Sequence, residues 1–161
     1  MKIMVIGSNG QLGSDLVKIL RQEPDPFEVI SLTHTDIEIT DPASIQRAFT
    51  AHQPQVVLST AAFHKLELCE ENAEKAFAVN AMGARHLAMA CETSKAELVF
   101  ISTDYVFGGE RDHAVPYQES DAPAPVNVYG VSKLAGEYFI RYLMEKYFIV
   151  RVCGLYGISG S

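Results

Sequence analysis

Short apolar runs alternate with longer segments of helical periodicity along the 161 residues of the chain. Continuous apolar runs of this length are typical of strands that are buried on both faces of a sheet. They lie at 2–6, 27–32, 54–59, 97–101 and 147–152. Apolar residues three or four positions apart predict helices at about 12–20, 43–51, 72–94 and 134–144, and the last helix could begin as early as Tyr129. This alternation predicts an α/β fold, in which a single domain forms a doubly wound parallel sheet.

Two segments are predicted to be loops. Residues 63–71 are polar, and residues 108–126 combine Gly108 and Gly109 with three prolines and scattered charge. A connection as long as the second is uncommon in a compact domain unless it has a function. A Pro-rich break at 23–26 is expected to end the first helix, and 155–161 form a Gly-rich stretch.

The apolar run at 2–6 leads directly into the motif Gly7-Ser8-Asn9-Gly10-Gln11-Leu12-Gly13, which a helical pattern follows. A strand, a glycine turn and a helix in this order are the context of a dinucleotide-binding fingerprint. Gly7 would permit the tight turn, Gly10 would let the backbone approach a pyrophosphate, and Gly13 would let the helix pack closely on the strand. The spacing is G-x-x-G-x-x-G instead of G-x-G-x-x-G. In the alternative interpretation, the glycines only make a tight turn.

The end of the second apolar run bears on the choice of cofactor. In sites that prefer NAD, an Asp or Glu near this point binds the ribose 2′-hydroxyl. Here the sequence is Thr33-His34-Thr35, and the first carboxylate is that of Asp36. Without a carboxylate, nothing repels a 2′-phosphate, and a partial charge on His34 would attract one. We therefore expect NADP(H) to be preferred, with NAD(H) as a possible cofactor.

Three residues are candidates for catalysis. Thr103 follows a predicted strand, where its hydroxyl could bind a substrate carbonyl or simply belong to a strand-end turn. Tyr129 and Lys133 are four residues apart, so they would share one face of a helix. A nearby ammonium would lower the pKa of the Tyr129 phenol, which suits a proton donor near neutral pH. In the alternative, both are ordinary surface side chains.

The predicted helix at 72–94 has one apolar face, and Asn80 interrupts it. Asn80 is therefore either a buried amide satisfied by backbone groups or a polar group that faces the site. The other residues of the face are Ala76, Phe77, Ala84, Leu87, Ala88 and Cys91.

Composition narrows the class of protein. A net charge of −7 and a pI near 5.2 argue against nucleic acid or an anionic membrane as the main partner. A small anionic ligand stays possible, because the N-terminus of a helix can bind phosphate. The three cysteines lack metal-ligand spacing and their odd number argues against a disulfide framework, so we expect no metal site. No apolar run is long enough for a membrane span, and we expect a cytoplasmic protein.

Together these motifs resemble the extended short-chain dehydrogenase/reductases, which have an NAD(P)-binding Rossmann fold, and within them the dTDP-4-dehydrorhamnose reductase family. The resemblance covers nearly the whole chain. Its most specific part is Ser102-Thr103-Asp104-Tyr105-Val106-Phe107 together with Asn127-Val128-Tyr129-Gly130-x-x-Lys133-Leu134-Ala135-Gly136-Glu137. The other matching segments are the glycine motif with Gln11-Leu12, Glu38-Ile39-Thr40-Asp41-Pro42, Ala61-Ala62 and Ala78-Val79-Asn80.

The resemblance implies reduction of the 4-keto group of a nucleotide-linked 6-deoxyhexulose, which gives dTDP-L-rhamnose. It makes Tyr129 the proton donor and Thr103 the partner of the reacting oxygen. Lys133 would bind the nicotinamide ribose and lower the pKa of the tyrosine. The residues implied in binding the cofactor are Gly7, Gly10, Gln11, Leu12, Gly13, Glu38, Ile39, Ala61, Ala62, Asn80, Tyr129 and Lys133.

The family's chain continues for well over a hundred residues, which build a substrate domain. Residues 1–161 therefore correspond to the dinucleotide-binding domain, either as a fragment or as a protein that no longer performs the whole reaction. The implied partner is a sugar nucleotide, and a homodimer is a possible assembly. Two alternatives stay open. One is a regulatory subunit like that of methionine adenosyltransferase. The other is a sister epimerase or dehydratase, although only Asp104 offers a carboxylate beside Thr103.

Overall fold

Five parallel strands form one sheet in a computed structural model that describes residues 1–24, 27–108 and 115–157. The order across the sheet is β2-β1-β3-β4-β5, so the direction of winding reverses between β1 and β3. This arrangement confirms the predicted doubly wound α/β fold. The strands are β1 (Lys2–Ile6), β2 (Glu28–Leu32), β3 (Val56–Ser59), β4 (Glu97–Thr103) and β5 (Tyr147–Val152).

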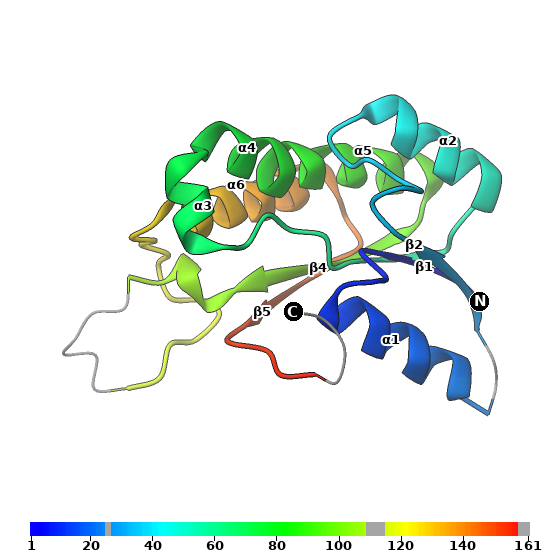
Figure 1. Cartoon of the computed structure of the whole chain (residues 1–161), viewed down its shortest axis with the longest axis horizontal. Coiled ribbons are helices and arrows are strands. Elements are labelled where there is room, and N and C mark those ends of the chain that lie inside the picture. The colour runs from blue at the N-terminus through cyan, green and yellow to red at the C-terminus, as the bar shows by residue number, and fades with distance from the viewer. Residues whose placement is uncertain (25–26, 109–114, 158–161) are drawn as a thin grey trace.

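Helices cover the two faces of the sheet unequally (Figure 1). On one face lies α1 (Gln11–Gln22). On the other face lie α2 (Pro42–His52), α3 (Leu66–Glu71), α4 (Ala73–Phe77), α5 (Ala84–Ser94) and α6 (Val128–Leu143). Within the described ranges, no helix is both long enough and apolar enough to cross a membrane.

Caps fix where two of the helices begin. The carboxylate of Asp41 accepts a hydrogen bond from the Ala43 amide at 2.9 Å, and Pro42 occupies the first position of α2. The side-chain oxygen of Asn127 accepts from the Gly130 amide at 2.7 Å, which starts α6 at Val128. The second cap matters for function, because it places Tyr129 in the first turn of α6.

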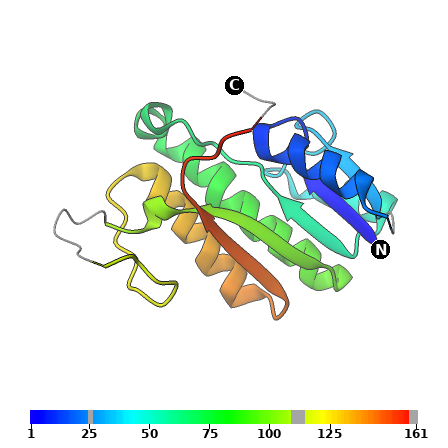
Figure 2. The same cartoon turned by 90° about the horizontal axis from the view of Figure 1, so that it is seen from below.

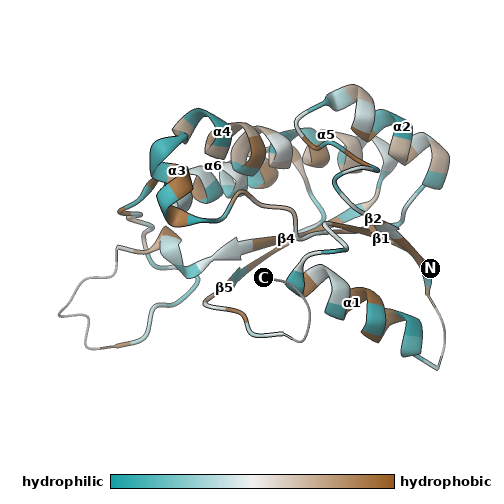
Figure 3. Cartoon of the chain, in the orientation of Figure 1, coloured by the Kyte–Doolittle hydropathy of each residue, from teal (hydrophilic) through white to brown (hydrophobic). Residues whose placement is uncertain are grey.

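The core is also divided between the two faces. The larger apolar cluster fills the space between the sheet and α2, α5 and α6, with Phe100, Leu87 and Ile140 among its buried members. The smaller cluster packs Val17 of α1 on Ile3 and Val5 of β1. Figure 3 shows the apolar residues concentrated along the strands. Seen from the side of α1, helix covers β1 and its neighbours, whereas no helix of the described chain lies over β4 and β5 (Figure 2).

The segment from 63 to 94 differs from its prediction in three ways. The expected polar loop contains α3, which is too short to show a periodic pattern and buries Cys69. The expected long helix is interrupted by η1, a π-helical stretch at Ala78–Gly83 between α4 and α5. Because of this interruption, Phe77 lies off the apolar face and is 36% exposed.

Other predictions fall partly outside the described residues. The Pro-rich break includes 25 and 26, the expected long loop includes 109–114, and the Gly-rich stretch includes 158–161. Beyond its predicted end, β4 continues as far as Thr103, where a short 3₁₀ turn, η2 (Asp104–Val106), follows. This extension of β4 shapes the site described next.

Candidate active site

A cleft of about 810 Å³ runs along the carboxyl ends of the strands and crosses the point where the winding reverses. Both its size and its position are typical of ligand sites in open α/β sheets. The glycine turn after β1 forms one end of the cleft, and the start of α6 forms the other. The predicted site residues that line it are Gly7, Gly10, Gln11, Leu12, Gly13, Glu38, Ile39, Ala61, Ala62, Thr103, Tyr129 and Lys133.

The glycine turn has the geometry that the sequence predicts. Gly7 has a φ of +84°, a conformation that disfavours side chains, and its amide donates to the Leu32 carbonyl at 2.9 Å. A Cβ on Gly13 would overlap the Gly7 carbonyl oxygen, so only glycine lets α1 pack this closely. A Cβ on Gly10 would lie 3.3 Å from the same oxygen, a much milder contact. The turn therefore brings bare backbone to the edge of the cleft.

The N-terminus of α1 is open to a ligand. Gly10 is its N-cap, and among the described residues no side chain caps the first turn, which carries no acidic residue. The first amides of a helix lack carbonyl partners, and the helix dipole adds a partial positive charge. Gln11, Leu12 and Gly13 thus present backbone donors at the end of the cleft, as a phosphate or pyrophosphate group requires.

In the segment after β2, both carboxylates accept hydrogen bonds from nearby threonines. The carboxylate of Asp36 accepts hydrogen bonds from the amide and the hydroxyl of Thr33 at 2.8 and 2.7 Å. These bonds, chiefly the one from the backbone amide, lower the pKa of the Asp36 carboxyl group. Glu38 accepts in the same way from Thr40, at 2.9 and 2.8 Å, and the pKa of its carboxyl group is also lowered, mainly by the backbone bond. The imidazole of His34 is 83% exposed and lies 3.4 Å from Glu38. His34 and Glu38 line the cleft, whereas Asp36 is not among its described lining residues.

At the end of the cleft near α6, β4 extends beyond its neighbour β3. Pairing between the two strands ends where Ser59 lies opposite Phe100, and β4 continues to Thr103, paired with β5 as far as Val152. The chain after β3 turns away, held by a hydrogen bond of 2.9 Å from the Thr60 hydroxyl to the Ile6 carbonyl. Residues 101–103 of β4 therefore have no partner among the described strands on the side of β3.

Thr103 and Tyr129 meet at this end of β4. Burial raises the pKa of the Tyr129 phenol, and a hydrogen bond with Thr103 partly opposes the rise. The Thr103 hydroxyl also donates to Asp104 and accepts from the Tyr105 amide, both at 3.2 Å, so it serves the strand-end turn as well. Tyr129 thus stays a neutral phenol near pH 7, which is the form that can give a proton.

The prediction that Lys133 lowers the pKa of Tyr129 is wrong for this structure. The ammonium nitrogen of Lys133 donates to the Ile101 carbonyl at 2.6 Å and lies 3.9 Å from the centre of the Phe100 ring. Burial lowers the pKa of Lys133 from 10.5 to about 7, although the charge of Glu137 opposes this change. A lysine that is bound to the strand and only partly charged does little to stabilise a phenolate.

Asn80 supports the site from behind. Its side chain is buried, exchanges two hydrogen bonds with the backbone of Phe63 at 2.8 and 2.9 Å, and donates to the Ser132 hydroxyl at 3.0 Å. Of the predicted site residues, all of which the structure describes, it is the one that does not line the cleft. The interpretation as a buried amide satisfied by backbone is therefore the correct one. Asn80 positions Phe63, which does line the cleft.

Two parts of the cleft wall were not predicted from the sequence. Phe63 and Lys75 line it together, with the Lys75 ammonium 5.1 Å from the centre of the Phe63 ring. The segment 152–155 closes the cleft over α1, where the Gln11 side chain donates to the Leu155 carbonyl at 3.1 Å. These residues belong to no motif, and the general rule that ligands bind beyond strand ends was the one signal for them. In the described chain, no group of three or more metal-ligating side chains could hold an ion.

The family model described as the RmlD substrate binding domain matches residues 1–161. The chain belongs to this family. Membership in the RmlD substrate binding domain family confirms the resemblance to dTDP-4-dehydrorhamnose reductases, since relatives and solved structures carry that name.

Three similar proteins illustrate the relationship. The spore coat polysaccharide biosynthesis protein SpsK of Bacillus subtilis is 39% identical over 160 residues, which cover 99% of this chain and 55% of SpsK. The dTDP-4-dehydrorhamnose reductase of Mycobacterium tuberculosis is 38% identical over 157 residues, or 96% of this chain and 50% of the relative. The crystal structure of the Bacillus anthracis reductase in complex with NADP is 38% identical with a TM-score of 0.93, covering 99% of this chain and 56% of that one. This member of the family thus spans about half the length of its relatives.

Proposed function

We propose that this chain supplies the cofactor-binding and catalytic groups of an NADPH-dependent reductase. Its substrate would be a nucleotide-linked 6-deoxyhexulose with a 4-keto group, as in the relatives named dTDP-4-dehydrorhamnose reductase. The observation that carries the proposal is that one cleft joins the open N-terminus of α1 to the Thr103–Tyr129 pair. The proposed partner of the chain is thus a sugar nucleotide, which is the substrate. Assembly into a homodimer remains a prediction.

The residues of the cleft fit NADP(H). Its pyrophosphate would lie on the backbone amides of Gln11, Leu12 and Gly13, at the place where Gly7 and Gly10 present no side chain. Its 2′-phosphate would meet the exposed imidazole of His34. When bound, NADPH supplies the hydride that reduces the carbonyl carbon.

The protein's own side chains supply the rest of the chemistry. Tyr129 gives its phenolic proton to the carbonyl oxygen as negative charge develops there, and the Thr103 hydroxyl donates a hydrogen bond to the same oxygen. Lys133 lies one helical turn from Tyr129 and borders the cleft. Its amine donates to the Ile101 carbonyl in this structure, and it would bind a hydroxyl of the cofactor's ribose by exchanging that partner. The buried position of Tyr129 keeps the proton on the phenol until the carbonyl takes it.

Two other functions are less well supported. A regulatory module that only binds cofactor has no need of Thr103 and Tyr129 side by side in the cleft. A dehydratase needs an acidic pair beside Thr103, and the carboxylate of Asp104 accepts a hydrogen bond from Thr103 itself. An epimerase would return the hydride to the sugar. Net oxidation of one NADPH for each sugar reduced is therefore the property that separates a reductase from these alternatives.

The change of Tyr129→Phe tests the proposal in the full-length protein. Turnover of dTDP-4-dehydrorhamnose, followed by the loss of NADPH absorbance, should fall by about 100-fold or more, because the general acid is removed. The affinity for NADPH should stay within a few-fold, since the phenyl ring keeps its place. Tyr142→Phe is the matched control, because Tyr142 lies on the same helix and is 86% exposed. A Tyr129→Phe protein with near-normal turnover would remove Tyr129 from the mechanism.

A further inference from the structure

Three side chains at intervals of one helical turn connect α6 to the end of β4. Tyr129 lies beside Thr103, Lys133 donates to the Ile101 carbonyl at 2.6 Å, and Glu137 accepts from the Ser102 hydroxyl at 2.6 Å. Positions 129, 133 and 137 of the helix thus lie against three consecutive residues of the strand. The first two helix positions have roles in the proposed reaction, and the third has none so far.

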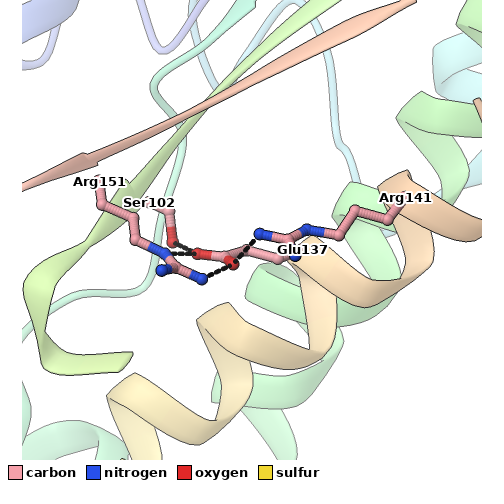
Figure 4. A network of polar contacts seen from close by, with 4 residues as sticks. All are labelled: Ser102, Glu137, Arg141 and Arg151. Carbon is pink, nitrogen blue, oxygen red and sulfur yellow. Dashed lines mark hydrogen bonds and ion pairs between the residues drawn. The ribbon is translucent and has the colours of Figure 1, made fainter. Parts of the chain in front are cut away.

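Glu137 makes more polar contacts than Tyr129 or Lys133. Its carboxylate is completely buried, and Arg151 of β5 donates to both oxygens, from Nε at 3.0 Å and from Nη2 at 2.7 Å (Figure 4). Arg141, one turn further along α6, adds a contact of 3.5 Å. A carboxylate bound by a two-point arginine and a serine has one orientation, because any rotation breaks several charge-assisted bonds.

The contacts of Glu137 connect elements that carry the chemistry. Ser102 precedes Thr103 in β4, and Arg151 precedes Val152, at which β5 enters the wall of the cleft. Glu137 itself is not among the described residues that line the cleft, so it does not touch a ligand there. Its carboxylate therefore ties the ends of two strands to the helix that bears Tyr129 and Lys133.

We propose that Glu137 is a positioning residue for the reduction, which sets the distance between Thr103 and Tyr129 and holds Lys133 in the cleft. The inference rests on the proposed function of the cleft. The charged or titratable groups near Glu137 are Arg141 and Lys133 on α6 and Arg151 on β5. Tyr129 and Asp104 lie further away, near the start of α6. Of these groups, Lys133 receives from Glu137 a negative charge that favours its protonated form.

A purely structural ion pair is the competing explanation. Replacing a buried ion pair by apolar residues is often neutral for stability, whereas removal of one partner leaves an unpaired charge. A positioning role predicts more than a loss of stability. It predicts that the protonation of Lys133 and the rate of the chemical step both change in a protein that is still folded.

The test compares Glu137→Gln with Glu145→Gln in the full-length protein. Glu145 is exposed, so its change alters the net charge by the same amount outside the network. For Glu137→Gln we expect kcat to fall by about tenfold or more, because misplacement of reacting groups is costly, while KM for NADPH stays within about twofold. In selectively ¹³C-labelled protein, the Lys133 side-chain resonance should titrate at a lower pH than in the wild type. Lys133→Met identifies that resonance.

A folded Glu137→Gln protein with unchanged kcat and an unchanged Lys133 titration would overturn the inference. If that variant does not fold, Ser102→Ala decides, because it keeps the Glu137–Arg151 pair and removes the bond to β4 alone. We then expect kcat to fall several-fold without a change in NADPH affinity, and an unaltered kcat would overturn the inference. If the wild type reduces no keto sugar, the proposed function fails, and the Lys133 titration still tests the effect of Glu137.

Discussion

Lys133 shows how strongly burial can change the chemistry of a single residue. Its amine is buried beneath the cleft, between the Phe100 ring and the Ile101 carbonyl, and its pKa lies near 7 instead of 10.5. The residue therefore exists in both protonation states near neutral pH, whereas an exposed lysine is fully charged. A pair of residues in a sequence cannot show this effect, because the burial of the amine depends on how α6 packs on β4.

The depressed pKa predicts how stability depends on pH. Above about pH 7, folded Lys133 has lost a proton that the unfolded chain keeps until about pH 10, so the unfolded state binds more protons. The free energy of unfolding of the wild type should therefore rise with pH across this window, relative to Lys133→Met, by about 1.4 kcal/mol per pH unit at most. Below pH 7 both states hold the proton, and the buried charge costs its full amount.

Denaturant unfolding of the wild type and Lys133→Met at about pH 6, 7 and 8.5 measures this difference. The comparison of two variants cancels the titration of other groups, such as the Cys91 thiol, whose pKa burial raises to about 12. A difference in unfolding free energy that stays constant over the three pH values would contradict the depressed pKa of Lys133.

At the scale of elements, the β1–α1 unit follows closely from its sequence, and the region from α3 to α5 does not. The glycine motif dictates the turn after β1 by steric exclusion, which is local and therefore visible in the sequence. The π-helical stretch η1 instead serves a long-range contact, because it contains Asn80, whose amide binds Phe63 and Ser132. Sequence patterns predicted all five strands and most of the cleft, since these depend on local periodicity and motifs.

Gly10 and Gly13, the second and third glycines of the motif, should respond differently to replacement by alanine. Gly13 lies within α1, where alanine would normally stabilise a helix by about 1 kcal/mol, but here its Cβ would overlap the Gly7 carbonyl. We expect Gly13→Ala to destabilise the fold by about 1–3 kcal/mol, as overpacking does. Gly10→Ala should leave stability nearly unchanged and weaken NADPH binding by about tenfold, because the methyl group occupies the approach of the pyrophosphate.

Thermal unfolding and a fluorescence titration with NADPH, applied to both variants, separate the two effects. We expect Gly13→Ala to lose stability and Gly10→Ala to lose affinity for NADPH. Equal losses of stability would contradict the steric difference between the two positions, and undiminished binding by a folded Gly10→Ala protein would show that Gly10 does not border the pyrophosphate.

At the scale of the whole molecule, the cleft is assembled within the part of the chain that the structure describes. Both of its ends and the walls between them come from residues 6–155. The face of β5 opposite α5 and α6 is different, because Phe148 and Val150 alternate with the packed Tyr147 and Ile149 and are exposed. Most residues that the sequence predicted for the site line the two ends of the cleft, but the wall formed by 152–155 was not predicted, because that wall depends on where β5 ends relative to α1.

Residues 1–161 should therefore bind NADPH by themselves. We expect saturable fluorescence titrations, with a dissociation constant for NADPH that is lower than for NADH, because His34 would face the 2′-phosphate in the proposed binding mode. His34→Asp places a carboxylate there and should reverse the preference, and the 83% exposure of His34 makes an effect on folding small. Tighter binding of NADH by the unaltered chain, or the same preference in both proteins, would refute the role of His34.

The unequal lengths of β3 and β4 also determine where the molecule can open locally. Leu98 and Phe100 lie between two paired strands, whereas the ladder at Ile101–Thr103 joins β4 to the edge strand β5 on one side. Amide hydrogen exchange at 101–103 should therefore follow the fraying of β5, while exchange at Leu98 and Phe100 requires a larger opening. Anything that braces the outer edge of β5 would slow this fraying, and the end of β4 that carries Thr103 would become more rigid with it.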